Sequence, residues 1–288
     1  MKIAVTGASG FVGRRLGEVA RARGHEVMAL GRSEGERKWD PMKEPAPLAG
    51  ADAVVHLAGE PVAEGRWTKR KMAAIRESRA TGTRNLVAGL RGTGVRALVS
   101  ASAVGYYGDR GDEELTEDSP PGNDFLAEVC REWEAEAAKS GVRTAMIRTG
   151  IVLGPDGGAL RKMLTPFKMG LGGRLGSGQQ WMSWIHRDDL VDLYLHALER
   201  ETVSGPLLGT CPSPVRNVEF TKTLGGVLGR WTFLPMPRWQ MRLIFGKVAT
   251  VLVSSQRCRP RRTSESGFAF RHPELEPALR QILASPPG

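Results

Sequence analysis

A glycine-rich turn near the start of the chain has the residue types and spacing to hold a phosphate group. The apolar run 2–5 leads directly into this turn, and an amphipathic helical pattern begins where the turn ends. A strand, a turn with three spaced glycines and a helix are typical of dinucleotide-binding folds. We expect the pyrophosphate to lie on free N–H groups at the helix start. The residues predicted to line this cradle are Thr6, Gly7, Ser9, Gly10, Phe11, Val12 and Gly13.

The residues that follow the second predicted strand bear on the choice of dinucleotide. An Asp or Glu about 20 residues beyond the glycines would accept hydrogen bonds from the adenosine ribose of NAD. This chain instead has Gly31, Arg32 and Ser33 there. An arginine fork and a hydroxyl suit a ribose 2′-phosphate, so we predict that Arg32 and Ser33 bind NADP(H). In the alternative, Arg32 is a solvated loop residue and Glu34 or Glu36 serves NAD.

The elements that would position these residues alternate along the first half of the chain. Strand patterns rich in Val, Ile, Leu and Ala occur at 2–6, 25–30, 52–57, 96–102 and 143–149. Helical patterns occur at 11–23, 67–90, 123–139, 187–199, 217–229, 237–253 and 273–283. Continuous apolar strands separated by helices predict a parallel sheet covered on both faces. The predicted fold class is α/β, a Rossmann-like doubly wound parallel sheet with a small, mostly helical C-terminal lobe.

Strand signals thin out in the last third of the chain, which separates a lobe from the sheet. We predict an NADP-binding domain at 1–205, with contributions from later segments, and a small substrate lobe at 206–288. The glycine-rich segment 170–178 is predicted to be an irregular, mobile loop beside the site, because it is unsuited to a regular element.

The composition of the chain indicates in which cellular compartment the protein acts and which kinds of partner it has. The first strand pattern begins at residue 2, which leaves no room for a targeting peptide, and no apolar run approaches the roughly 20 residues that cross a bilayer. The three cysteines have no metal-binding spacing, which suits a reducing cytosol and predicts neither a disulfide framework nor a metal site. We therefore expect a cytoplasmic protein with no membrane partner.

The net charge of +10 raises the question of a nucleic-acid partner. The basic residues are spread along the chain, and 31 of the 41 are arginine. Their densest group has no interleaved aromatic residues and consists of Arg257, Arg259, Arg261 and Arg262. Nucleic-acid binding is therefore not favoured, and a small-molecule substrate is expected instead.

Several motifs together give a resemblance to a known family. They are Thr6-Gly-x-x-Gly-x-x-Gly13, Asp52-Ala-Val-Val-His-Leu-Ala-Gly59, Ser100-Ala-Ser-Ala-Val-Gly-Tyr-Tyr-Gly108 and Trp184-Ile-His-Arg-Asp-Asp-Leu190. The chain resembles the extended short-chain dehydrogenase/reductase superfamily over essentially its whole length. More narrowly, it is similar to an atypical epimerase-like branch named for NAD-dependent epimerases and dehydratases, which has a distinct C-terminal domain. That branch shares Arg148-Thr-Gly-Ile-Val-Leu-Gly154 and Gly267-Phe-x-Phe-x-His-Pro-Glu-Leu275.

The resemblance also implies further contacts to NADP(H). Relatives in this branch use an arginine at the position of Arg79 and another at the position of Arg148. The loop that follows the third predicted strand would also contact the cofactor, through Leu57, Ala58, Gly59 and Glu60. For each arginine the alternative is an ion pair within the protein, because a charge at a strand end needs a phosphate or a carboxylate.

The superfamily's catalytic residues are only partly present. Typical members have a serine at a strand end, which resembles Ser102 here, and a Tyr-x-x-x-Lys pair on one helix. The helix expected to carry that pair has Phe125 and Val129 at the two positions, or Leu126 and Cys130 in the next register. Neither register recovers the pair, so the proton donor must come from elsewhere or be missing.

Three interpretations of this loss remain open. Tyr106 or Tyr107, just after Ser102, could donate the proton from a different backbone position, although packing is an equally good explanation of both rings. Glu128 on the helix could act, although a surface glutamate explains it more simply. The chain could also bind NADP(H) without turning over a substrate.

The resemblance favours an NADP-dependent oxidoreductase or epimerase that acts on a small hydroxyl- or carbonyl-bearing molecule, such as a nucleotide sugar. Hydride would pass between the nicotinamide and a substrate carbon, with Ser102 holding the oxygen and Tyr106 or Tyr107 supplying the proton. The alternative from another class is a catalytically silent NADP(H)-binding sensor or scaffold. Extended relatives often build a dimer interface from the helices predicted at 67–90 and 123–139, which implies a homodimer unless these helices present charged faces to water.

Overall fold

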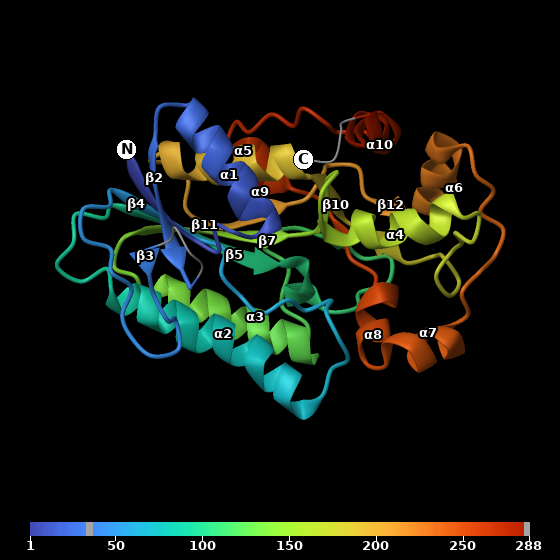
Figure 1. The fold of residues 1–288 in the computed structure, drawn as a ribbon, viewed down its shortest axis with the longest axis horizontal. Helices are drawn as coiled ribbons and strands as arrows, with labels where there is room; N and C mark the ends of the chain where they lie inside the picture. Colours follow the sequence, from blue (N-terminus) through green and yellow to red (C-terminus); the bar gives the residue numbers. More distant parts are fainter. Residues whose placement is uncertain (33–36, 285–288) are drawn as a thin grey trace.

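The computed structural model describes residues 1–32 and 37–284, so the predicted cofactor residue Ser33 lies outside the described residues (Figure 1). Within them, one parallel sheet has the strand order β11-β7-β5-β4-β1-β2-β3. Its strands are β1 (Lys2–Thr6), β2 (Glu26–Gly31), β3 (Arg37–Lys38), β4 (Ala53–His56), β5 (Ala97–Ala103), β7 (Arg143–Thr149) and β11 (Gly205–Gly209). The predicted doubly wound α/β sheet is confirmed.

Helices cover both faces of this sheet, as its apolar strands require. Figure 1 shows α1 (Phe11–Ala22) and α5 (Arg187–Glu199) on one face, and α2 (Lys69–Ala88) and α3 (Phe125–Ala138) on the other. Alternate strand residues face the two layers. On β1, Ile3 and Val5 belong to the core under α1 and α5, whereas Ala4 belongs to the opposite core.

The C-terminal lobe is mostly helical, as predicted. It contains α6 (Asn217–Leu228), α7 (Arg238–Phe245), α8 (Val248–Val253), α9 (Arg261–Glu265) and α10 (Leu275–Ala284). Its core also takes residues from before position 205, because α4 (Gly158–Lys168) and β10 (Trp184–His186) pack into it. Leu160 and Trp184 are buried there with Phe220 and Leu279. The boundary predicted at residue 205 falls at the start of β11, and the lobe core includes residues on both sides of it.

Short strand pairs join the lobe to the sheet. They are β8 (Ile151–Leu153) with β10, β9 (Trp181–Met182) with β12 (Val215–Arg216), and β6 (Glu114–Leu115) with β13 (Arg257–Cys258). A 3₁₀ turn, η1 (Val104–Tyr107), follows β5 directly. The lobe therefore lies against the segments that leave the carboxyl ends of β5 and β7.

Several elements differ from the sequence prediction, and three of these differences have a local cause. The helix predicted at 237–253 is two helices, since Gly246 between them has a φ of +59°. Strand β11 was not predicted because it contains Pro206, and an edge strand tolerates a proline that a central strand would not. Helix α4 was also missed, because Pro166 lies inside it. Within the described residues, no helix is both long and apolar enough to cross a membrane.

A buried carboxylate holds the lobe against the sheet. Glu117, which is 3% exposed, accepts hydrogen bonds from the backbone N–H of Leu208, Arg262 and Thr263, at 3.1 to 3.2 Å. The Thr263 hydroxyl also donates to it, at 3.2 Å. One side chain thus connects the segment between β6 and α3 with strand β11 and helix α9.

We predict that Glu117→Ala lowers the free energy of unfolding by about 2 kcal/mol, because buried N–H groups lose their acceptor. Urea denaturation followed by circular dichroism measures the change. Glu265→Ala is the matched control, since the Glu265 side chain is 65% exposed, and it should alter stability by less than about 0.5 kcal/mol. Equal stability of the two variants would contradict this account of how the lobe is attached.

Candidate active site

The strand order reverses at β1, which has β2 on one side and β4 on the other. In open parallel sheets, ligands bind beyond the carboxyl ends of the strands at such a switch point. The structure places the glycine-rich turn, the loop after β4 and the end of β5 along this edge. Ser102 on β5 and Arg148 on β7, which the sequence analysis placed at strand ends, are direct register partners there.

The glycine cradle is shaped by close backbone contacts. Gly7 has a φ of +68°, and a Cβ on it would lie 3.0 Å from the Ala58 nitrogen. A Cβ on Gly13 would lie 2.1 Å from the Gly7 carbonyl oxygen. Neither residue can therefore carry a side chain without moving the turn.

The start of α1 is open to an anion. Gly10 is its N-cap and supplies no side-chain hydrogen bond, and the first turn contains no acidic residue. Unpaired N–H groups at a helix start attract negative charge, which fits a dinucleotide pyrophosphate. Side chains of the first turn have other roles, since the Phe11 ring packs on the loop of Gly154 and Gly157 and Val12 packs on the core. Ser9 is exposed beside the turn.

A buried threonine and histidine fasten the two strands on either side of the switch point. The Thr6 hydroxyl lies 2.7 Å from Nδ1 of His56, and it accepts hydrogen bonds from the N–H groups of Leu57 and Ala58 at 3.2 Å. Nε2 of His56 lies 3.1 Å from the Thr83 hydroxyl on α2. Burial, together with the nearby charge of Arg79, lowers the pKa of His56 to about 4, so the ring is neutral.

Arg79 reaches from α2 to the loop after β4. Its guanidinium donates to the carbonyl oxygens of Glu60 and Ile75, and it lies over the Trp133 ring at 4.9 Å. It also lies 3.3 Å from the place that a Cβ on Gly59 would take. The nearby carboxylate of Glu60 pairs with Lys71 at 2.6 Å. Burial lowers the pKa of Arg79, and this cation faces the predicted cofactor loop with backbone carbonyls as its hydrogen-bond acceptors.

Arg32 follows β2 directly and is exposed. Its charge contributes to lowering the pKa of Asp40, although the backbone hydrogen bond from Met42 is the main cause. An exposed guanidinium one strand away from the glycine turn is available to a phosphate on the adenosine ribose. The cofactor roles of Arg32 and Ser33 stay predictions.

Arg148 lies in a buried polar network. Its Nε and Nη2 donate to the two oxygens of Glu134, both at 2.8 Å, and its Nη1 donates to the Tyr107 hydroxyl and the Glu117 carbonyl, both at 2.9 Å. Burial alone would lower the pKa of Arg148, but the hydrogen bonds and charges of Glu134 and Tyr107 together outweigh burial and raise it. The Ser102 hydroxyl donates to the same carboxylate at 2.6 Å. In this structure Arg148 therefore forms the ion pair that the sequence left as the alternative to a cofactor contact.

Sequence reasoning missed Glu134, although α3 contains a signal for it. Ala127, Cys130 and Ala137 form the buried stripe of this helix, and Glu134 falls within the stripe at helical spacing. A carboxylate in an apolar stripe needs a buried cation, and a strand-end arginine needs a carboxylate. The pairing of Glu134 with Arg148 could therefore have been predicted from the sequence.

The two candidate tyrosines have different surroundings. Tyr107 is fully buried, and its hydroxyl donates to the Thr116 carbonyl at 2.9 Å while it accepts from Arg148. Burial raises the pKa of Tyr107, although the charge of Arg148 opposes this. Tyr106 is half-buried, and its ring lies 3.5 Å from the Arg148 guanidinium carbon. Among the described residues, none forms a hydrogen bond to the Tyr106 hydroxyl.

The comparisons with known proteins agree with this geometry. Residues 3–206 match the NAD dependent epimerase/dehydratase family, and residues 236–282 match a domain of unknown function, DUF1731. The chain belongs to the NAD dependent epimerase/dehydratase family. The resemblance inferred from the sequence motifs, including the distinct C-terminal domain, is confirmed.

Curated relatives extend this agreement to the whole chain. An epimerase family protein from Arabidopsis thaliana, the chloroplastic SDR39U1 homolog, is 42% identical and covers 98% of this chain and 87% of its own. Human SDR39U1 is 38% identical and covers 99% of this chain and 100% of its own. Because one relative is chloroplastic, the cytoplasmic location stays a prediction.

Solved structures give the same assignment. The crystal structure of human SDR39U1 with NADPH has a TM-score of 0.93 at 37% identity and covers 98% of this chain and 99% of that one. A nucleoside-diphosphate sugar epimerase from Corynebacterium glutamicum has a TM-score of 0.82 at 39% identity and covers 98% of this chain and 58% of that one. The UDP-glucose 4-epimerase of Thermotoga maritima, at 18% identity, shares the fold with a TM-score of 0.80 and covers 98% of this chain and 97% of that one.

We predict that His56 makes stability depend on pH below neutrality. Its folded pKa, about 4, is below the value of about 6.5 for an unfolded chain. Its contribution is therefore fully present above pH 6.5 and is lost as the pH falls towards 4, by an amount on the order of 3 kcal/mol. Denaturant unfolding measured at several pH values should show this loss.

The variant His56→Gln should have a shallower dependence of unfolding free energy on pH between 6.5 and 4. His25→Gln is the control, because His25 follows the far end of α1 and has no contact with Thr6 or Thr83, and it should keep the loss that is assigned to His56. If His56→Gln keeps that loss as well, the neutral buried histidine is not its source.

Proposed function

We propose that this protein is an NADP(H)-dependent oxidoreductase or epimerase that acts on a small hydroxyl- or carbonyl-bearing substrate. The observation that carries the proposal is the contact of the Tyr106 ring with the Arg148 guanidinium, at the same edge of the sheet as the glycine cradle. It is supported by the crystal structure of human SDR39U1, which was solved with NADPH. The chemistry that NADP(H) supplies when bound is the transfer of a hydride.

The residues of the chain divide the work between binding and proton transfer. The cradle residues Gly7, Gly10 and Gly13 would hold the pyrophosphate on backbone N–H groups. Arg32 and Ser33 would hold the ribose 2′-phosphate by charge-assisted hydrogen bonds. Leu57, Ala58, Gly59 and Glu60 would border the cofactor, with Arg79 behind them.

The proposed proton donor is Tyr106, because its hydroxyl is unpaired among the described residues. Arg148 holds the ring by a cation–π contact, and the two bonds to Glu134 fix the arginine in turn. Tyr107 fits a positioning role better than an acid role, since it is buried and both hydrogen bonds of its hydroxyl are made. Ser102, which is 3% exposed, would act through Glu134 unless its hydroxyl turns towards a substrate oxygen.

The substrate class proposed here is a nucleotide sugar or a similar carbonyl compound. Solved relatives are named for such reactions, among them the sugar epimerase from Corynebacterium glutamicum. We also propose a homodimer through α2 and α3, as in extended relatives. The two helices are already linked by ion pairs of Arg76 with Glu128 and of Arg84 with Glu136.

The cofactor preference is tested first. We expect purified protein to bind NADPH more tightly than NADH, and Arg32→Ala to remove about 10- to 100-fold of that preference, since a charged hydrogen bond contributes about 1.5–3 kcal/mol. Fluorescence titration with both nucleotides measures it. Arg96→Ala is the control, because Arg96 is exposed at the opposite edge of the sheet. Equal affinities of the native protein for the two nucleotides would refute the assignment.

The proton donor is tested with a panel of nucleotide sugars and ketones. We expect Tyr106→Phe to lower turnover at least about 100-fold while NADPH binding is kept, because only the acid is lost. NADPH absorbance reports reduction, and chromatography of the products reports epimerisation.

Tyr107→Phe provides the comparison. It should lower the unfolding free energy by about 1–3 kcal/mol, since two buried partners lose a hydrogen bond. Full activity of Tyr106→Phe would show that Tyr106 is not the acid. Tight NADPH binding without turnover of any compound would instead favour the silent binding protein.

A further inference from the structure

The outer end of the C-terminal lobe exposes large apolar side chains. Trp231 is 81% exposed and Leu243 is 68% exposed, although soluble surfaces rarely group such residues. We call this group the lobe-tip patch, and its members are Trp231, Phe233, Leu234, Trp239, Leu243 and Ile244. In Figure 1 the connection from α6 to α7, and α7 itself, lie at the end of the molecule farthest from β2 and β3.

The glycine-rich loop predicted from the sequence extends this patch. The N–H of Met236 donates to the Arg174 carbonyl, and the N–H of Gly176 donates to the Met236 carbonyl, both at 2.9 Å. The same loop exposes Met169 and Leu171. Apart from the patch and these two residues, the large apolar side chains that are exposed among the described residues are only Met1 and Met42.

Helix α7 presents two parallel ridges to the surface. Trp239 and Leu243 are four residues apart and form an apolar ridge, while Arg238 and Arg242 form a cationic ridge beside it. Met241 is buried on the opposite side of the helix. Among the described residues, no ion pair is formed with Arg238 or Arg242, so both charges are available to a partner.

The chain around the patch carries no negative charge. Between Glu219 and Glu265 there is no Asp or Glu, but there are two lysines and seven arginines. The segment between Asp156 and Asp188, which contains the glycine-rich loop, also lacks acidic residues. The surface therefore combines apolar side chains with cations, and an anionic partner would complement it.

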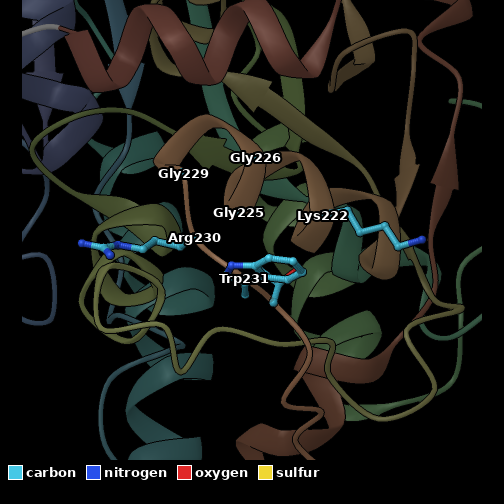
Figure 2. Close-up of a pocket in the computed structure, with 7 residues that line it drawn as sticks. Lys222, Gly225, Gly226, Gly229, Arg230 and Trp231 are labelled. Atoms are coloured by element: carbon cyan, nitrogen blue, oxygen red, sulfur yellow. The ribbon is translucent and has the colours of Figure 1, made fainter.

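A shallow hollow of about 310 Å³ opens beside Trp231 on α6. Figure 2 shows Trp231 between Arg230 and Lys222, whose side chains extend to either side. Exposed backbone at Gly226 and Gly229 lines the hollow, whereas Gly225 is buried against Thr232, whose methyl group lies 2.3 Å from the place that a Cβ would take. This arrangement puts cations around an aromatic ring, a combination that suits the boundary between lipid headgroups and acyl chains.

Two other occupants fit the patch less well. A second copy of this chain would bring two cationic surfaces together, which disfavours a dimer at this face. A nucleic acid would use the arginines and tryptophans, but it would leave the aliphatic side chains of Leu234, Leu243 and Ile244 without a function. An anionic lipid surface accepts both kinds of side chain.

We propose that the lobe-tip patch docks on an anionic membrane surface, with Trp239 and Leu243 inserted among the acyl chains and Arg238 and Arg242 on the headgroups. This is attachment at the membrane surface, and it needs no spanning helix. The sequence analysis expected no membrane partner because the chain has no spanning segment, and the proposal replaces that expectation only for surface attachment. The attachment goes beyond the proposed reaction and does not depend on it.

The test is sedimentation of the full chain with vesicles of phosphatidylcholine containing about 30 mol % phosphatidylglycerol. We expect binding at low salt that falls as salt is raised, and none to pure phosphatidylcholine. The pair Arg238→Gln with Arg242→Gln should lower the partition coefficient about 30-fold, from the loss of two surface cations. The pair Trp239→Ser with Leu243→Ser should abolish binding and also the blue shift of tryptophan fluorescence.

The control pair, Arg91→Gln with Arg96→Gln, removes two exposed cations at the other end of the molecule and should bind like the native protein. Unchanged NADPH affinity of every variant shows that each one is folded. The proposal is overturned if the native protein does not bind anionic vesicles, or if the control pair loses as much binding as the α7 pair. It is also overturned if the patch variants change only the oligomeric state or the binding of single-stranded DNA.

Discussion

The ion pair of Arg148 with Glu134 holds together the part of the molecule where chemistry is proposed. The two side chains are 4% and 12% exposed, and removing one partner of such a pair typically costs about 3–5 kcal/mol, because the other charge stays buried. Arg148 also donates to the Glu117 carbonyl, and the Glu117 carboxylate accepts bonds from β11 and α9. One arginine thus connects β7 with α3 and with the segment after β6, which attaches the lobe. The position of Tyr106 depends on all of these contacts.

This constraint divides the candidate site into two unlike halves. In the cofactor half, the start of α1 has no side-chain cap and the Arg32 guanidinium is exposed, so both are available to phosphates. In the catalytic half, most polar groups already have partners, since Glu134 binds both Ser102 and Arg148. The cofactor half is therefore ready for a ligand, whereas in the other half the Tyr106 hydroxyl is the group left for a substrate.

The sequence was sufficient for the five central strands of the sheet and for the cradle, because both have local signals. Apolar strand runs and spaced glycines can be recognised from a few neighbouring residues. Strand β1, for example, has its predicted bounds. Local signals fail where tertiary contacts decide. Pro206 made the edge strand β11 unrecognisable from the sequence, and Gly246 divides a predicted helix into two. The ion pair of Glu134 with Arg148 joins residues on different elements. The motif identified the strand-end arginine, but its partner depends on how α3 packs.

The absence of the lysine of the Tyr-x-x-x-Lys pair is explained by the charges that surround its position. One of the two registers places Cys130 at the lysine position, and this side chain is 4% exposed. Burial, and secondarily the charge of Glu134, raises the pKa of Cys130 to about 12, so the thiol is neutral, while Arg79 and Arg148 both act on it from nearby. A lysine there would place a third cation in a buried space that two guanidiniums already border, with Glu134 committed to one of them. The positive charge that typical members carry on this helix is supplied here by α2 and β7, and a small neutral residue on α3 is the side chain that such an arrangement allows.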